Sequence, residues 1–144
     1  MKTVKQVLDH KGYQLHSIAP EASVYEALQK MAQEGIGALV VLDGGELAGI
    51  LSERDYARKV ILEGRHSRDT LVSDIMTENV ICVGSDLGVD ALMSIMTEKR
   101  VRHLVVRDDA RITGLISIGD VVKAIIDDQQ FTIEQLEHYI SGHA

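Results

Sequence analysis

The chain has 144 residues, a formal net charge of -7 and 45% hydrophobic residues, which is the size and composition of an ordinary globular domain. The negative charge argues against nucleic-acid binding, because that function needs a clustered basic surface. No apolar run reaches the roughly 18 residues of a membrane span, and the first residues lack the apolar stretch of a signal peptide. We therefore expect a cytoplasmic protein without a membrane partner. The only cysteine, Cys82, excludes a disulfide within the chain, and we expect its small side chain to be buried.

The first half of the chain predicts the order strand, helix, strand, strand, helix. Ser23 and Glu26 form a capping box at the start of the first helix. A hairpin turn at 43–46 separates two short apolar runs that are typical of strands. The expected elements are an extended segment at 13–18, helices at 23–34 and 52–64, and strands at 38–42 and 47–51. The second helix is expected to carry Tyr56, Val60 and Ile61 on one side.

The second half repeats this order. Its expected elements are a strand at 80–83, a helix at 87–99, strands at 103–107 and 112–117, and a helix at 118–128. Polar residues connect the two halves. The expected division is therefore a first repeat at 4–65, a linker at 66–73, a second repeat at 74–130 and a tail at 131–144.

The tail contains a second helix signal of its own. Thr132 and Gln135 have the spacing of a capping box, which predicts a separate short helix ending near Ile140. Ile133, Leu136 and Ile140 then fall on one face. We expect this face to pack against the rest of the protein rather than form a membrane or partner surface.

One motif occurs twice. The segment GILSERD at 49–55 reappears as GLISIGD at 114–120, 65 residues later, and each copy ends a similar run of predicted elements. Two copies are too few for a solenoid, which needs about three stacked units. The repeat therefore predicts a closed pseudo-twofold pair with two related clefts.

The repeated motif has two interpretations. In the first, Ser52 and Ser117 cap the helices that follow, and Asp55 and Asp120 stabilise the positive ends of those helices. In the second, the same helix start binds a phosphate, and the carboxylate accepts hydrogen bonds from ribose hydroxyls. Glycines at positions 49 and 114 would then let a ligand approach the backbone closely.

The cations near the two motifs differ. The first motif contains Arg54, and Arg58 follows one helical turn later. Near the second, the basic side chains lie before and within a strand, at Arg100, Arg102 and His103. Each could be an ordinary surface charge. Beside a repeated Gly-Ser-Asp unit in an acidic protein, they are also candidates for binding a compact anion.

These features together resemble a tandem pair of CBS (cystathionine-beta-synthase-type) domains over about residues 4 to 130. The resemblance rests on VSDIM at 72–76 with its weaker counterpart VKQVL at 4–8, on the strands GIGALVVLD and RVRHLVVRD, and on the two motifs. The chain is similar to small free-standing bacterial proteins of this kind. The resemblance implies an α/β (α+β) fold, in which two pseudo-twofold-related repeats form a disc called a Bateman module, with a short C-terminal helix.

The resemblance also implies adenosine-containing ligands, namely AMP, ADP, ATP, NAD or S-adenosylmethionine, with AMP as the first candidate. In the family, Ser and Asp of one repeat hold ribose and phosphate, and backbone of the other repeat holds adenine. Carried onto this chain, one cleft would combine Ser117 and Asp120 with His16, Ile36, Gly37 and Ala38. The other would combine Ser52, Arg54 and Asp55 with Ile81, Val101, Arg102 and His103, and Arg102 could serve either cleft.

No catalytic motif accompanies this site. The sequence lacks a nucleophile elbow, a P-loop and an H-E-x-x-H metal motif, so we expect no enzyme activity, no catalytic cofactor and no metal. The leading hypothesis is a non-catalytic nucleotide sensor that acts on an unknown protein partner. The alternative is a constitutive dimerisation or scaffold module with vestigial clefts, and a small nucleotide hydrolase is a third possibility. We expect a homodimer, because two small repeats leave apolar helical faces for a twofold partner to cover. The tail adds the apolar face of Ile133, Leu136 and Ile140 to this interface or instead folds back on its own subunit.

Overall fold

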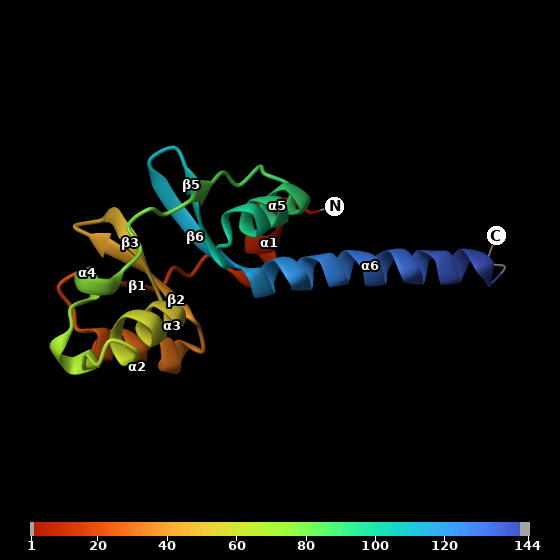
Figure 1. The fold of residues 1–144 in the computed structure, drawn as a ribbon. Coiled ribbons are helices and arrows are strands. Elements are labelled where there is room, and N and C mark those ends of the chain that lie inside the picture. Colours follow the sequence, from red (N-terminus) through yellow and green to blue (C-terminus); the bar gives the residue numbers. More distant parts are fainter. Residues whose placement is uncertain (1, 142–144) are drawn as a thin grey trace. The chain divides into compact units, whose positions relative to one another are not determined.

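The computed structural model describes residues 2–141, so the last three residues of the predicted tail lie outside the described residues. The chain forms two compact units. The middle unit consists of residues 14–81, and the terminal unit combines the segment before residue 14 with the segment from residue 82 onward. Each unit contains a three-stranded sheet covered by helices (Figure 1).

The sheet of the middle unit has the order β1-β2-β3. The strands β1 (Ser17–Ile18) and β2 (Ala38–Asp43) are parallel, and β3 (Glu46–Ser52) is antiparallel to β2. The predicted hairpin turn is confirmed, since Gly44 and Gly45 have positive φ angles of 59° and 89°, a conformation that glycine adopts without steric cost. Four consecutive residues of β2, from Ala38 to Val41, are buried, so this strand lies in the core.

Helix α2 (Val24–Glu34) covers this sheet. The Ser23 hydroxyl accepts a hydrogen bond from the Glu26 amide, and Gly35 ends the helix with a left-handed φ of 65°. Val24, Ala27 and Met31 lie on its buried face. Both ends of this helix therefore follow from the cap residues that the sequence indicates.

The second helix of the middle unit differs from its prediction. It consists of one α-helical turn, α3 (Glu53–Tyr56), followed by the π-helical turn η1 (Ala57–Ile61). Val60 is fully buried, whereas the side chain of Ile61 is 54% exposed. The expectation that these two residues share a side is wrong, because consecutive residues of a helix point in different directions, roughly 100° apart in an α-helix, and here only Val60 points into the core.

The segment predicted to be a linker is structured and belongs to the middle unit. It contains the 3-10 turn η2 (Ser67–Asp69) and leads into the short helix α4 (Val72–Ile75). The Val24 amide donates to the Thr70 carbonyl at 2.8 Å, and the Val72 amide donates to the Ala22 carbonyl at 2.8 Å. These bonds tie the segment to the start of α2.

The terminal unit repeats the same sheet topology with β4 (Cys82–Val83), β5 (His103–Asp108) and β6 (Arg111–Ser117). The β2–β3 and β5–β6 pairs have a register shift at the corresponding place, after Val41 and after Val106. The helix α5 (Val89–Lys99) corresponds to α2. Cys82 is exposed, so the expectation that it is buried is wrong; it lies at the start of a two-residue edge strand.

The terminal unit also contains a helix that the sequence did not lead us to expect, α1 (Val4–Lys11). Its signal was present: Thr3 and Gln6 form a capping box, the type of signal used for the other helices. Val4, Val7 and Leu8 are its buried residues. The Val4 amide donates to the Leu87 carbonyl at 2.8 Å, which joins the first residues of the chain to its second half.

The last element, α6 (Ile118–Ile140), is one continuous helix of 23 residues rather than two shorter helices. Thr132 does not cap a new helix, because its hydroxyl donates to the Asp128 carbonyl one turn earlier, at 3.0 Å. Its second half extends beyond the rest of its unit (Figure 1). Ile133, Leu136 and Ile140 are 47%, 55% and 79% exposed, so the expectation that this face packs against the protein is wrong.

Candidate functional site

The repeated motif forms the same capping box in both units. The Ser52 hydroxyl accepts a hydrogen bond from the Asp55 amide at 3.2 Å, and the Asp55 carboxylate accepts one from the Ser52 amide at 3.0 Å. In the terminal unit, the Ser117 hydroxyl accepts from the Asp120 amide at 3.2 Å, and the Asp120 carboxylate accepts from the Ser117 amide at 2.9 Å. The capping interpretation is therefore confirmed for both copies.

Each of these carboxylates also pairs with a lysine. Lys11 of α1 approaches Asp120 Oδ2 at 2.7 Å and donates to the Leu115 carbonyl at 2.6 Å. In the middle unit, Lys59 lies 3.2 Å from Asp55 Oδ1. The two carboxylates are thus held in place from two sides, by their own helix start and by a cation.

Burial raises the pKa of Asp120, but the hydrogen bond from the Lys11 ammonium and the bond from the Ser117 amide together lower that pKa by more. The net pKa lies below the ordinary value of 3.8. Asp120 is therefore an anion at neutral pH. An ionised carboxylate accepts hydrogen bonds but donates none, which suits it to hydroxyl groups on a ligand.

The two motif glycines have a packing role. A Cβ atom on Gly49 would lie 2.7 Å from the Thr77 carbonyl oxygen, and one on Gly114 would lie 2.8 Å from Leu8 Cδ2. Both distances are shorter than real Cβ contacts allow. The space beside each glycine is thus filled by its own unit, and the interpretation that these glycines admit a ligand is wrong.

Each motif lies beside the strand start of its own unit. Ala38 pairs with Ser52 in the β2–β3 register, and the Glu53 amide donates to the Gly37 carbonyl at 3.0 Å. In the terminal unit, His103 pairs with Ser117, and the Ile118 amide donates to the Arg102 carbonyl at 2.8 Å. The structure therefore brings together residues that the family resemblance assigns to different clefts.

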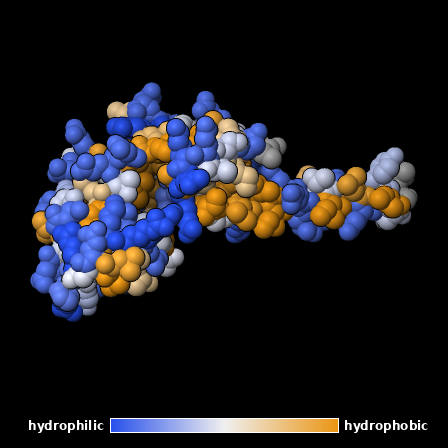
Figure 2. Space-filling model, viewed as in Figure 1, coloured by the Kyte–Doolittle hydropathy of each residue, from blue (hydrophilic) through white to orange (hydrophobic). Residues whose placement is uncertain are grey.

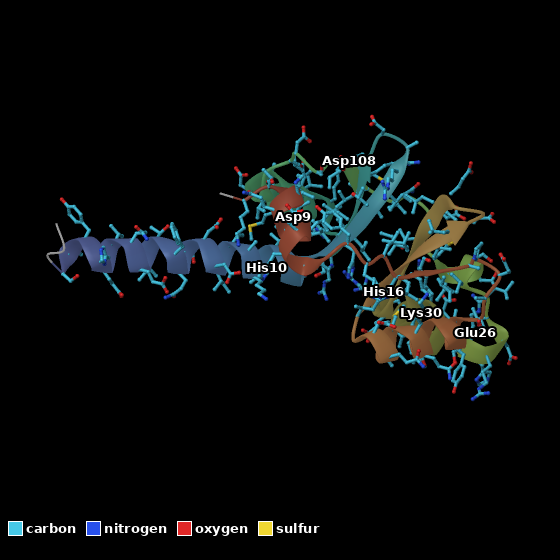
Figure 3. The ribbon with its side chains drawn as sticks, turned by 180° about the vertical axis from the view of Figure 1, so that it is seen from behind. Asp9, His10, His16, Glu26, Lys30 and Asp108 are labelled. Carbon is cyan, nitrogen blue, oxygen red and sulfur yellow. The ribbon has the colours of Figure 1, made fainter. Side chains whose placement is uncertain are left out.

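The remaining predicted site residues of the middle unit are placed as follows. His16 Nε2 lies 3.8 Å from Glu34 Oε2, and Figure 3 shows this histidine in the stretch of chain before β1. Ile36 and Gly37 line a pocket of about 330 Å³ together with Glu53. Arg54 is exposed and makes no ion pair with the residues that the structure describes. Ile81 is partly buried at the end of the unit.

In the terminal unit, the Val101 amide donates to the Met96 carbonyl at 3.1 Å, just after Arg100 ends α5 with a left-handed φ of 55°. Arg102 is exposed, and within residues 2–141 it has no ion-pair partner. Each of the two predicted residue sets draws on both units, so these clefts stay predictions.

A second pocket lies beside Asp120 in the terminal unit, where α1 meets α6. Its volume is about 300 Å³. Besides Asp120, its lining residues are Lys2, Val7, His10, Lys11, Lys123, Ala124 and Asp127, and Figure 3 shows His10 on α1 near the start of α6. The sequence interpretation missed His10 and Lys11, because α1 was not expected and lies more than a hundred residues before Asp120.

This pocket combines two aspartates, Asp120 and Asp127, with three lysines, which is suitable for a hydroxylated and phosphorylated small molecule. Among residues 2–141, no group of three His, Cys, Asp or Glu side chains is arranged to hold a metal ion. No helix within the same residues is long and apolar enough to cross a membrane.

Comparisons with known proteins agree on one family. The CBS domain model matches residues 4–62 and 72–127. The CBS domain-containing protein CBSX3, mitochondrial, of Arabidopsis thaliana is 40% identical over 149 residues, covering 97% of this chain and 72% of that protein. A protein with CBS domains from Burkholderia ambifaria MC40-6 is 49% identical with a TM-score of 0.86, covering 92% of this chain and 99% of that one.

A second similar structure contains ligands. It is the CBS domain pair of protein MJ0100, solved in complex with 5'-methylthioadenosine and S-adenosyl-L-methionine. This pair is 25% identical to the chain with a TM-score of 0.79, covering 89% of this chain and 98% of that one. The predicted fold class, two CBS repeats and a C-terminal helix, is confirmed.

Proposed function

Because the chain belongs to the CBS-domain family and contains two copies of the domain, we propose that it is a non-catalytic sensor of an adenosine-containing ligand. AMP is the first candidate, and ADP, ATP, NAD and S-adenosylmethionine are the others. The complex of the MJ0100 pair with two adenosine derivatives supports this class of ligand. Binding would bias one arrangement of the protein only if the ligand binds that arrangement more tightly.

The observation that carries the proposal is that the Asp120 carboxylate is ionised and is held by hydrogen bonds through one of its two oxygens. The hydrogen bonds that Asp120 accepts from Lys11 and from the Ser117 amide both end on Oδ2. Among residues 2–141, no hydrogen bond reaches Oδ1, so this oxygen is left for a ligand. Asp120 also lines the pocket of about 300 Å³. Its ionised carboxylate can accept hydrogen bonds from ribose hydroxyls, and Lys11 and Lys123 in the same pocket supply positive charge for phosphate.

Asp55 in the middle unit has no comparable free oxygen. Its Oδ2 accepts hydrogen bonds from the Ser52 amide and hydroxyl, and its Oδ1 accepts one from the Thr77 hydroxyl and pairs with Lys59. A ligand hydroxyl would have to displace one of these partners. We therefore propose that the two motifs are unequal and that the Asp120 site binds more tightly.

The proposal extends to partners. The module would act as a homodimer and transmit its ligand state to a protein partner whose identity is unknown. A cytoplasmic location stays a prediction from the sequence. The competing function is a constitutive scaffold, and the capping role of both motifs favours it, because a cap stabilises the fold without any ligand.

Mass spectrometry of small molecules released from the purified, denatured protein tests the proposal directly. We expect an adenosine derivative in the released fraction. Isothermal titration of ligand-free protein with all five candidates should then give saturable binding to at least one. No released nucleotide and no binding of any candidate would replace the sensor with the scaffold. Overnight incubation with ATP, AMP and NAD should leave each unchanged, and product formation would contradict the non-catalytic assignment.

A further inference from the structure

Five of the eight large apolar residues of α6 that are exposed follow a regular spacing, and Ile118, Phe131 and Tyr139 lie outside it. Val122, Ile126, Ile133, Leu136 and Ile140 are 42%, 56%, 47%, 55% and 79% exposed. Figure 2 shows hydrophobic surface along much of this helix. With Gln129 added, successive positions are separated by four, three, four, three and four residues. We call these six residues the α6 seam.

Alternate spacings of three and four residues are the a and d positions of a coiled-coil heptad. In this frame Ile126, Ile133 and Ile140 occupy a, and Val122, Gln129 and Leu136 occupy d. Such a seam packs against another helix by placing each side chain between four side chains of the partner. The occupant that this pattern specifies is therefore a helix.

The terminal unit itself does not cover the seam. Its contact with α6 buries Val121 and Ala124, which lie on a different side of the helix from Val122 and Ile126. Residues 129–140 number twelve, and an isolated helix of this length is marginal in water. A partner helix would stabilise the second half of α6, because its apolar face is not covered by its own unit.

The charges beside the seam indicate which helix fits. The residue that follows each d position flanks the interface, and these flanking residues are Lys123, Gln130 and Glu137. In an antiparallel pair of two α6 helices centred on Phe131, Ile126 meets Leu136 of the second copy, and Ile133 meets Gln129. The same register places Lys123 beside Glu137 of the second copy, and by symmetry Glu137 beside Lys123. The helix is thus complementary in charge to itself.

A parallel pair gives no such match. In a parallel pair, each flanking residue faces the residue that lies five positions earlier in the partner helix. Glu137 would then face Thr132, and Gln130 would face Ile125. Gln129 would also stack on its own copy in the core. Lys123 would face no acidic residue in this register. Lys123 and Glu137, which pair in the antiparallel register, would therefore both lack a partner of opposite charge.

We propose that α6 forms an antiparallel coiled coil with α6 of a second copy of this chain, through the α6 seam. This inference rests on the homodimer of the proposed function and specifies its surface and orientation. The groove beside the seam supports it: the residues that line a pocket of about 830 Å³ include Gln129 and Ile133 of the seam and Phe131 next to it. The flank of a second helix would occupy this groove.

The first test disrupts the seam. Ile133→Asp puts a charge in the middle of both copies of the interface and should raise the dimer dissociation constant by at least about 100-fold. Glu134→Lys, one residue away on the outer face, should leave it within about twofold. Sedimentation equilibrium on the full chain measures both. If the wild-type chain is a monomer, both this inference and the proposed homodimer are wrong. If Ile133→Asp remains a dimer, the homodimer stands and only the assignment of its interface to the α6 seam is wrong.

The second test reads the orientation from charge. Lys123→Glu and Glu137→Lys each turn two attractive contacts into repulsive ones and should each weaken the dimer roughly tenfold. The double variant exchanges the charges and should return to within about twofold of the wild type. Losses that simply add in the double variant would overturn the antiparallel register. Circular dichroism of each variant checks that α6 and the fold are retained.

The third test measures the orientation as a distance. A nitroxide label at Ser141→Cys, in a Cys82→Ser background, lies ten residues from the proposed centre on each copy. At a rise of 1.5 Å per residue, the antiparallel pair separates the two labels by about 30 Å along the axis, whereas a parallel pair brings them within roughly 10–20 Å. Pulsed electron paramagnetic resonance should give the longer distance, and the shorter one would overturn the proposal. Ligand titration of Ile133→Asp and of the Ser141→Cys protein reports separately on the sensor function, since neither residue lines the pocket beside Asp120.

Discussion

Lys11 and Asp120 are joined at 2.7 Å although 109 positions separate them along the chain. The contact brings a cation from α1 to the carboxylate at the start of α6. It holds the pKa of Asp120 below its ordinary value despite burial. The ligand-binding properties proposed for Asp120 therefore depend on a residue near the beginning of the chain.

Replacing this lysine should change the titration of Asp120. In Lys11→Met, burial continues to raise the pKa of Asp120 while the opposing hydrogen bond is lost, so this pKa should rise. Carbon-13 NMR titration of the carboxyl group measures it. Lys59→Met, which removes the corresponding lysine of Asp55, should leave the pKa of Asp120 unchanged. An unaltered pKa in Lys11→Met would show that Lys11 does not control this carboxylate.

The same shift affects stability at low pH. Because the pKa of Asp120 in the folded protein lies below 3.8, its ionised form contributes stability that is present above that pH. This stability is lost as the pH falls through the folded-state pKa. Lys11→Met should therefore begin acid unfolding at a higher pH than the wild type. Fluorescence- or circular dichroism-monitored acid titration checks this, and coincident curves would contradict it.

A bound adenosine ligand should raise the melting temperature. A ligand that binds only the native state adds about 2.7 kcal/mol at roughly 100 times its dissociation constant. We expect the largest increase with AMP or a close relative, measured by differential scanning calorimetry. A flat response to AMP, ADP, ATP, NAD and S-adenosylmethionine would favour the scaffold function.

Asp120→Ala and Asp55→Ala separate the ligand role from the cap role. Each variant removes a helix-start carboxylate and should cost about 1 kcal/mol of stability. Only Asp120→Ala should also weaken ligand binding strongly, by about 1.5 to 3 kcal/mol, which is roughly tenfold to a hundredfold. Urea unfolding and isothermal titration measure the two quantities. Equal ligand affinity in both variants would contradict the proposed inequality of the two motifs.

Arg102→Ala should reduce nucleotide binding more than adenosine binding. The family resemblance places Arg102 beside the predicted clefts, where its exposed guanidinium would pair with phosphate, which adenosine lacks. Arg111→Ala removes another exposed arginine, on β6, and should leave the ratio of AMP to adenosine affinity unchanged. Titration with both compounds gives this ratio, and an equal loss for both would remove Arg102 from the phosphate site.

The two motif glycines should differ in their tolerance of alanine. At Gly49 the new methyl would meet the Thr77 carbonyl, which backbone hydrogen bonds to Ile50 hold in place, so Gly49→Ala should cost about 1–3 kcal/mol. Gly114→Ala meets only the end of the Leu8 side chain, which can move, and should cost less. Urea unfolding tests the order. The control Gly119→Ala has ordinary space and should be neutral or slightly stabilising.

Much of the local structure was determined by the sequence alone. Helix α2 is capped by Ser23 and Gly35. The Ser23 hydroxyl accepts a hydrogen bond from the free Glu26 amide, and Gly35, which has no side chain, adopts the left-handed conformation in which its amide donates to the Met31 carbonyl. The two Ser-x-x-Asp motifs were predictable as caps for the same reason, since a cap needs only neighbours within three residues. The repeat itself identified the family fold, because equivalent apolar and turn residues specify equivalent elements.

Only the tertiary structure decided the features that depend on distant contacts. Nothing in the local sequence around Asp120 indicates that Lys11 reaches it, or that Leu8 fills the space beside Gly114. Thr132 has the spacing of a cap, yet it lies inside α6, because its hydroxyl can bond a carbonyl of the preceding turn and the helix can continue. Whether an apolar stripe is buried also depends on what packs beside it. The sequence thus predicted the face that carries Ile133, Leu136 and Ile140, but only the folded unit left that face exposed.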